Sequence, residues 1–160
     1  MIRKLTLLDF ENWKALRIEG IKNNPESFGE TYQQVLNQNI SHLETSLKNG
    51  QIFAYEEGEQ MSGLIGTYTL QPDNMKHRIN LFGLYVRPKH RRKNIGNQLV
   101  QHVINNLSLE HKQIRLSVTT NNNTAIALYK KNGFEIYGTG PKALKIDGQY
   151  FDEYLMIRHD

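Results

Sequence analysis

The residues best suited to chemistry form a basic turn, Arg91-Arg92-Lys93-Asn94-Ile95-Gly96, between a predicted strand and a predicted amphipathic helix. Backbone N–H groups at a helix N-terminus attract anions, and the cationic side chains of the turn stand beside them. Gly96 permits close approach of a ligand to the main chain, and Asn94 tolerates left-handed geometry. The turn is a predicted phosphate site, and a solvated basic turn that only starts a helix is the alternative.

A second segment, residues 118–134, combines a polar loop with a short helix. Asn122 is placed to cap the helix, apolar side chains including Tyr129 form one face, and Gly133 is a C-terminal stop. Local physics explains most of this segment without a ligand.

The elements that must position these segments alternate in type along the chain. The centre is a strand-helix-strand unit over residues 79–119, whose crossover we expect to be right-handed and whose strands we expect to be parallel. Hydrophobic periodicity and turn residues predict strands at 1–7, 51–56, 61–70, 78–86, 114–119, 134–138 and 150–158, and helices after Asp9, at about 32–48, at 95–106 and at 124–132. This order predicts one mixed α/β domain over residues 1–160, without linker or repeat.

Composition narrows the function classes. The chain has no cysteine, which excludes disulfides, thiolate metal sites and cysteine nucleophiles. Its 6 histidines show no H-x-x-x-H or comparable spacing, so we predict no metal. The first residues lack the apolar block of a signal peptide, and no stretch approaches the roughly 20 apolar residues of a membrane span. A cytoplasmic location is the default expectation.

The formal charge of +4 and the sequence pI of about 9.2 fit a phosphorylated ligand, an acidic partner or nucleic acid. A nucleic-acid-binding module built on the basic run 87–93 is one alternative. The acidic residues Glu56, Glu57 and Glu59 argue against a continuous basic surface, so we expect nucleic acid not to be the partner.

Taken together, the two segments resemble the GNAT superfamily of N-acetyltransferases over about residues 78–137. The family motif [QR]-x-x-G-x-[GA] occurs as Arg91, Asn94 and Gly96, with Asn94 in place of the first glycine. The downstream pattern N-x-x-A-x-x-L-Y-x-x-x-G-F occurs without departure, as Asn122, Ala125, Leu128, Tyr129, Gly133 and Phe134.

The resemblance implies a mostly antiparallel sheet with one splayed parallel strand pair, flanked by helices. The acyl-pantetheine arm of acetyl-CoA would fill the gap between the splayed strands, and the amides of the basic turn would hold the pyrophosphate. The residues so implied in binding acetyl-CoA are Leu84, Tyr85, Val86, Arg91, Arg92, Lys93, Asn94, Ile95, Gly96, Asn97, Asn122, Ala125 and Tyr129.

The implied reaction is direct attack of a neutral amine on the acetyl carbonyl. A positioned N–H such as that of Val86 would stabilise the oxyanion. Tyr129 lies where relatives protonate the departing thiolate, and a tyrosine with an ordinary pKa of about 10 can donate a proton while staying neutral at pH 7. A core tyrosine on the apolar face of the helix is the alternative.

The general base is open at this stage. The position where some relatives carry a catalytic carboxylate holds Asn80, which cannot act as a base but can orient a water. His90 reads as part of the basic turn. The candidate bases are Glu30, His77, Tyr150 and Glu153.

A small primary amine, such as an amino acid, a polyamine or an amino-bearing antibiotic, is favoured as acceptor over a protein N-terminus or lysine. The chain offers acceptor elements only in its first two helices and the 142–150 connection. Acidic side chains that could draw a cationic amine are Glu19, Glu26, Glu30 and Asp147. A GNAT fold that only senses acyl-CoA, a longer acyl group and a homodimer are further open alternatives.

Overall fold

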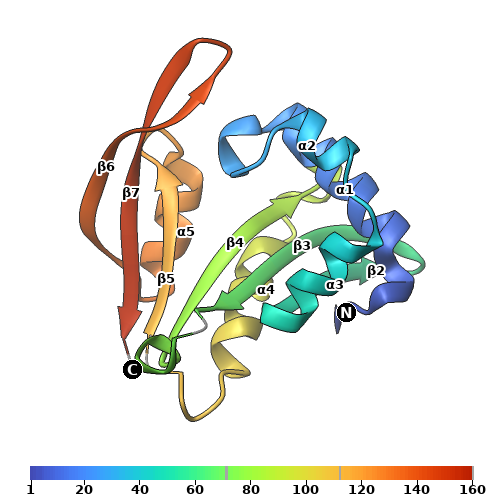
Figure 1. The fold of residues 1–160 in the computed structure, drawn as a ribbon, viewed down its shortest axis with the longest axis horizontal. Coiled ribbons are helices and arrows are strands. Elements are labelled where there is room, and N and C mark those ends of the chain that lie inside the picture. Colours follow the sequence, from blue (N-terminus) through green and yellow to red (C-terminus); the bar gives the residue numbers. More distant parts are fainter. Residues whose placement is uncertain (71, 112, 160) are drawn as a thin grey trace.

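The computed structural model describes residues 1–70, 72–111 and 113–159, and within them seven strands form one mixed sheet in the order β1-β2-β3-β4-β5-β7-β6 (Figure 1). The strands are β1 Ile2–Lys4, β2 Gly50–Glu57, β3 Gln60–Thr69, β4 Arg78–Val86, β5 Gln113–Thr119, β6 Glu135–Ile146 and β7 Gln149–His159. The α-helices are α1 Phe10–Asn23, α2 Tyr32–Leu36, α3 Ile40–Asn49, α4 Ile95–Asn105 and α5 Asn123–Lys131.

Strands β4 and β5 run parallel, whereas the other neighbouring strands are antiparallel. In the part of the chain that the structure describes, their pairing covers Arg78–Asn80 with Gln113–Arg115. Beyond this point the two strands diverge, as Figure 1 shows, and we call the divergence the fork. The prediction of a mostly antiparallel sheet with one splayed parallel pair is confirmed.

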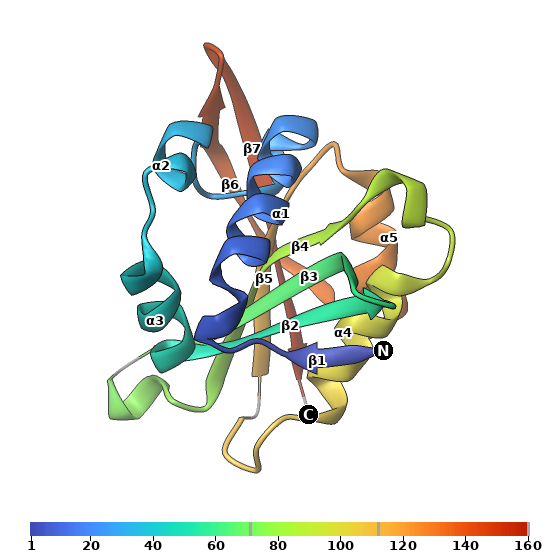
Figure 2. The ribbon, with the colours of Figure 1, turned by 90° about the vertical axis from the view of Figure 1, so that its right-hand side faces the viewer.

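The helices lie in two layers, with α1, α2 and α3 over one face of the sheet and α4 and α5 against the other (Figure 2). The period of two in the strands produces this arrangement, because successive side chains point to opposite faces. Ile52 and Ala54 pack with α1 and α3, whereas Phe53 and Ile65 pack with α4. None of the helices in the described part of the chain has the length and apolarity needed to cross a bilayer.

The predicted helix over residues 32–48 was wrong in one respect, because it is two helices, α2 and α3. The break falls at Asn37-Gln38-Asn39. Asn37 ends α2, and the side chain of Asn39 accepts a hydrogen bond from Ser41 N–H at 3.0 Å, which caps α3. Local caps at two asparagines therefore override the continuous helical pattern.

Asp9 precedes α1 as predicted, but its side chain does not cap that helix. The guanidinium of Arg3 donates to both Asp9 carboxylate oxygens, at 2.8 and 3.0 Å. The hydroxyl of Thr6 caps the 3-10 turn Leu7–Asp9 instead. A bidentate ion pair is stronger than a neutral cap, so it takes the carboxylate, and it holds the pKa of Asp9 below its ordinary value.

The prediction of a short strand at 134–138 underestimated β6, which continues to Ile146 and forms a long hairpin with β7. Residues 142–150 are therefore mostly paired strand rather than an open connection. The strand tolerates Pro141 because this residue lies in an irregular stretch of the pairing, between the paired residues Gly140 and Leu144.

Candidate active site

A cavity of about 660 Å³ lies where the end of β4 meets the starts of α4 and α5, and we call it the loop cavity. All of the residues predicted to bind acetyl-CoA line it, except Lys93 and Tyr129. The lining residues are Asn24, Ser27, Leu84, Tyr85, Val86, Arg91, Arg92, Asn94, Ile95, Gly96, Asn97, Asn122, Thr124, Ala125 and Leu128.

The basic turn holds two residues in left-handed backbone geometry. Arg92 has φ of 72° and Asn94 has φ of 63° with ψ of 20°. Asn94 occupies the N-cap of α4 but makes no side-chain cap, so the first N–H groups of the helix stay open to an anion. This is the geometry that the glycine of the motif would adopt freely and that asparagine tolerates.

Arg91 fixes the turn to the rest of the protein. Its Nε donates to the carbonyl of Val86 at 3.0 Å, and its Nη2 donates to Asn24 Oδ1 at 3.1 Å. The turn is thereby tied both to the end of β4 and to the C-terminus of α1.

Lys93 points away from the loop cavity, since its Nζ lies 3.2 Å from Glu57 Oε2. The buried His90 places Nδ1 3.3 Å from the other oxygen of the same carboxylate. Lys93 holds the pKa of Glu57 below its ordinary value, with a smaller contribution from His90. The basic run is thus partly neutralised within the fold, which weakens the nucleic-acid alternative.

Gly96 is not required by packing inside the protein. A Cβ added there would lie 3.5 Å from Leu128 Cδ2 and 3.9 Å from Val86 Cγ2, both ordinary contacts. Because the fold itself has room for a side chain, the missing side chain serves the space of the loop cavity.

The last residues of β4 expose main-chain groups in the gap between the diverged strands β4 and β5. Gly83, with φ of 65°, lies in the irregular stretch where the β3–β4 register shifts. Arg87 N–H donates to Ser62 O at 2.9 Å, and Val86 stands opposite Gly63. In antiparallel strands, pairs that exchange hydrogen bonds alternate with pairs that do not, so the pair Val86–Gly63, next to the hydrogen bond of Arg87, is a non-hydrogen-bonded pair. The N–H of Val86 therefore points away from β3, toward the side from which β5 has diverged.

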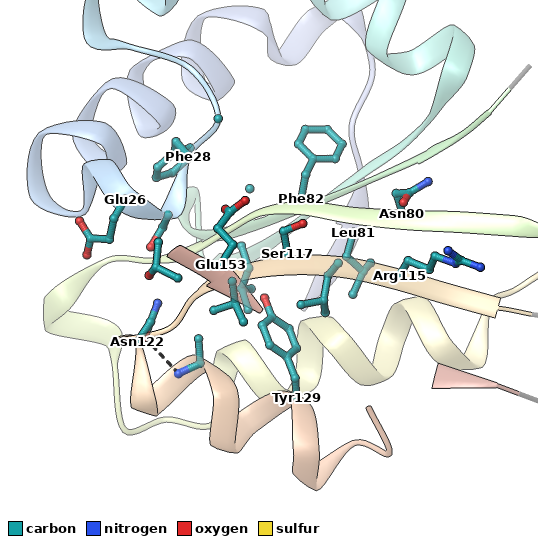
Figure 3. Close-up of a pocket in the computed structure, with 18 of the residues that line it drawn as sticks. Glu26, Phe28, Asn80, Leu81, Phe82, Arg115, Ser117, Asn122, Tyr129 and Glu153 are labelled. Carbon is teal, nitrogen blue, oxygen red and sulfur yellow. Dashed lines mark hydrogen bonds between the residues drawn. The ribbon is translucent and has the colours of Figure 1, made fainter. Parts of the chain in front are cut away.

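A second cavity of about 380 Å³ adjoins the first, and we call it the fork cavity (Figure 3). The two cavities share Ser27, Leu84, Asn122 and Ala125. Asn122 Oδ1 accepts a hydrogen bond from Ala125 N–H at 3.2 Å and so caps α5, which holds the Asn122 amide at the junction. The walls of the fork cavity come from α1, residues 26–30, β3, β4, β5, α5 and the β6–β7 hairpin.

Tyr129 projects from α5 into the fork cavity, and its hydroxyl points toward the labelled Glu153 and Ser117 in Figure 3. The residue is only 8% exposed, and its ring packs edge to face on Phe134 with centroids 5.7 Å apart. Burial raises the pKa of the hydroxyl above its ordinary value, so the group is a neutral proton donor at pH 7. Among the described residues it has no hydrogen-bond partner.

Glu153 is the one of the four candidate bases that projects into the fork cavity without an ion pair to any described residue (Figure 3). Burial raises the pKa of its carboxyl above the ordinary value. Glu30 also lines the cavity, but the guanidinium of Arg17 binds it. His77 and Tyr150 lie outside the lining of both cavities.

The acidic side chains expected to draw the amine are dispersed. Glu26 and Glu30 line the fork cavity. Glu19 instead accepts a hydrogen bond from the hydroxyl of Tyr85 at 2.9 Å, and Asp147 lies in the turn of the β6–β7 hairpin. The carboxylates of helix α1 and of the hairpin turn are therefore not part of the cavity.

Arg17 closes the α1 side of the fork cavity, and the resemblance to the family had placed Leu16-Arg17 of the first helix on the acceptor side without giving Arg17 a role. Its guanidinium lies 4.5 Å from the Trp13 ring centroid, donates to Gln38 Oε1 at 2.6 Å and pairs with Glu30. Gln38 also donates to Glu30, which completes a partly buried network that joins α1, the loop at Glu30 and the break between α2 and α3. These contacts fix the Arg17 side chain at the edge of the cavity.

Strand β5 contributes further polar side chains that were not predicted, namely Arg115, Ser117 and Thr119. Thr119 is 2% exposed, stands opposite Glu153 in the β5–β7 pairing, and its Oγ1 has no hydrogen-bond partner within the described chain. The signal was visible in the sequence, because polar and apolar residues alternate through 113–119. Within the residues that the structure describes, no group of three or more potential metal ligands is found.

The model of the family described as "Acetyltransferase (GNAT) domain" matches residues 48–136, which is more than half of the chain. The chain belongs to the GNAT acetyltransferase family. A sequence relative, the L-amino acid N-acetyltransferase AaaT of Escherichia coli K12, is 32% identical over 110 residues, covering 68% of this chain and 67% of that protein. The family predicted from the two motifs is confirmed.

Solved structures agree with this GNAT fold. A GNAT acetyltransferase from Streptococcus pneumoniae superposes with a TM-score of 0.86 at 20% identity, covering 100% of this chain and 99% of that one. The acetyltransferase YncA of Salmonella typhimurium, solved with acetyl-CoA, has a TM-score of 0.84 at 17% identity, covering 99% and 92% of the two chains.

The left-handed geometry of Asn94 gives a test of the basic turn. We expect Asn94→Ala to lower the free energy of unfolding by about 1 kcal/mol, because alanine adopts this geometry less readily, and Asn94→Gly to maintain or raise it. Urea denaturation measures both. Asn12→Ala in the exposed part of α1 is the matched control and should not destabilise. Equal stability of the two Asn94 variants would contradict the strain.

Proposed function

We propose that this GNAT protein transfers the acetyl group of acetyl-CoA to the primary amine of a small molecule by direct attack. The observation that carries the proposal is the junction of the loop and fork cavities at Leu84, Asn122 and Ala125, with Tyr129 on the fork side. A donor in one cavity and an acceptor in the other would meet at this junction. The acetyl-CoA bound to YncA supports the choice of donor.

Different parts of the loop cavity would bind the pyrophosphate and the pantetheine arm of acetyl-CoA. The uncapped first turn of α4 and the cationic Arg92 would hold the pyrophosphate. The outward main chain of β4 at Leu84 and Val86 would bind the pantetheine arm, and the amide of Asn122 would contact it from α5. Arg91 acts indirectly in this scheme, because its side chain fixes the turn.

The residues around the junction provide each proton movement that the reaction needs. Glu153 would take the proton from the ammonium or attacking amine, and its raised pKa brings it closer to the working pH. The carbon–nitrogen bond then forms while the N–H of Val86 stabilises the oxyanion. As the carbon–sulfur bond breaks, Tyr129 would donate its proton to the leaving thiolate.

An amino acid is the acceptor that the comparisons favour, because AaaT is described as an L-amino acid N-acetyltransferase. Polyamines and amino-bearing antibiotics are the other small amines that the sequence leaves open. A cytoplasmic location and a homodimer stay predictions from the sequence.

Binding of acetyl-CoA can be measured by isothermal titration into the purified protein and into Gly96→Glu. We expect the variant to lose about 100-fold or more in affinity, because its side chain fills the loop cavity and brings a negative charge to the pyrophosphate site. Gln101→Glu adds the same charge on the exposed face of α4 and should bind normally. No binding by the wild-type protein would refute the proposed function.

Tyr129→Phe tests the proton donor. The phenyl ring keeps the packing against Phe134, so we expect unchanged acetyl-CoA affinity and a kcat about 100-fold lower in a thiol-release assay. Tyr32→Phe on the exposed side of α2 is the control. A normal kcat for Tyr129→Phe would reduce this residue to a core tyrosine.

The pH profile tests Glu153. The carboxylate must be deprotonated to act as a base, so kcat/KM should fall as the pH drops through its raised pKa. We expect Glu153→Gln to lower kcat about 100-fold and to remove this acidic limb, with acetyl-CoA binding retained. A limb that survives in Glu153→Gln would assign the base to another group, Glu26 being the next carboxylate in the cavity.

A further inference from the structure

The end of the fork cavity farthest from the junction carries two polar side chains at paired positions of the parallel strands. Asn80 and Arg115 are the last residues of β4 and β5 in register before the strands diverge. Figure 3 places both at one end of the cavity, with Glu153 and Tyr129 in its middle and Asn122 toward the opposite end. The cavity therefore extends from the junction to the fork.

The amide of Asn80 is an unused hydrogen-bond donor. Its Nδ2 is buried and has no partner among the described residues. Buried amide groups are nearly always hydrogen-bonded, because an unpaired one loses its solvation without compensation. A donor of this kind on a cavity wall indicates an acceptor group on the ligand.

Arg115 adds a cation with open donors. Its Nε donates to Gln113 Oε1 at 3.1 Å, and its guanidinium lies 5.4 Å from the Tyr137 ring centroid. This is the only hydrogen bond of the side chain within the described residues, so the two terminal nitrogens are available. Their forked geometry matches the two oxygens of a carboxylate.

The other charges of the cavity agree with an anion at the fork. Arg17 is already bound by Glu30 and Gln38, so it is not an open cation. Arg78 also lines the cavity, and its buried Nε has no hydrogen-bond partner among the described residues, so it adds positive charge near Asn80. The unpaired carboxylate of Glu153 lies nearer the middle of the cavity (Figure 3). Positive charge at the fork and negative charge beside Tyr129 complement a molecule with an amine at one point and an anion at another.

We propose that Asn80 and Arg115 bind the carboxylate of the acceptor, so that the acceptor is an amino acid and not a polyamine. The inference rests on the proposed acetyltransferase function and narrows its substrate class. A polyamine would place a second ammonium against Arg115, and like charges in close contact repel each other. An amino acid places its carboxylate on the open donors and its amine toward Glu153 and Tyr129.

The experiment compares L-amino acids with their decarboxylated amines in a thiol-release assay, for example L-leucine with 3-methylbutylamine and L-arginine with agmatine. The wild-type protein should give the higher kcat/KM with the amino acid of an active pair. Arg115→Gln should lower kcat/KM for that amino acid about 10- to 100-fold, mainly through KM, and change the value for the matched amine less than about twofold.

A second variant keeps the test valid if Arg115→Gln folds poorly. Asn80→Asp is nearly isosteric and places a carboxylate beside Arg115, so it should weaken amino acid acetylation and favour the amine. Lys131→Gln, which removes one positive charge from the exposed end of α5, is the control and should change neither. Titration with acetyl-CoA shows that each variant is folded.

Two results would overturn the proposal while leaving the acetyltransferase function intact. One is a wild-type preference for the amine in every active pair. The other is an equal loss for both members of a pair in Arg115→Gln, since an anchor for the carboxylate affects only the acceptor that has one. Failure of the wild-type protein to bind acetyl-CoA would instead refute the proposed function itself.

Discussion

The early end of the parallel pairing between β4 and β5 is the constraint on which the rest of the site depends. Within the described residues, three residue pairs hold the strands together before they separate. Each strand stays in place because it is fixed on its far side, β4 to β3 and β5 to β7. The unpaired backbone left between them would be unfavourable in a closed core, and here it faces the two adjoining cavities.

The basic turn is held in unfavourable geometry by contacts that do not involve a ligand. Helix α4 is anchored by apolar residues such as Leu99 and Val103, and Arg91 ties the turn to β4. Lys93 is fixed from the other side by Glu57 on the β2–β3 hairpin. The free energy of ordering the turn is therefore met when the protein folds, so that binding does not have to supply it.

The two halves of the site differ in how well the sequence predicted them. The loop cavity is built from one contiguous strand-helix unit and one helix start, so local motifs such as Arg91 to Gly96 were sufficient. The fork cavity gathers Arg17, Glu30 and Glu153 from distant segments, and their convergence depends on packing that no local pattern encodes. The same reason explains β6, where Pro141 read as a strand breaker and pairing with β7 overrode it.

The two cavities differ in which parts of the chain supply their lining residues, and this difference has an evolutionary consequence. Apart from Asn24 and Ser27, the residues around the loop cavity lie inside the segment matched by the family model, 48–136. Arg17, Glu30 and Glu153 lie outside it. Mutations in the N-terminal third or in the last hairpin would therefore alter the α1 and β7 walls of the fork cavity and leave the residues around the loop cavity unchanged. Part of the proposed acceptor site can thus change in evolution independently of the proposed acetyl-CoA site.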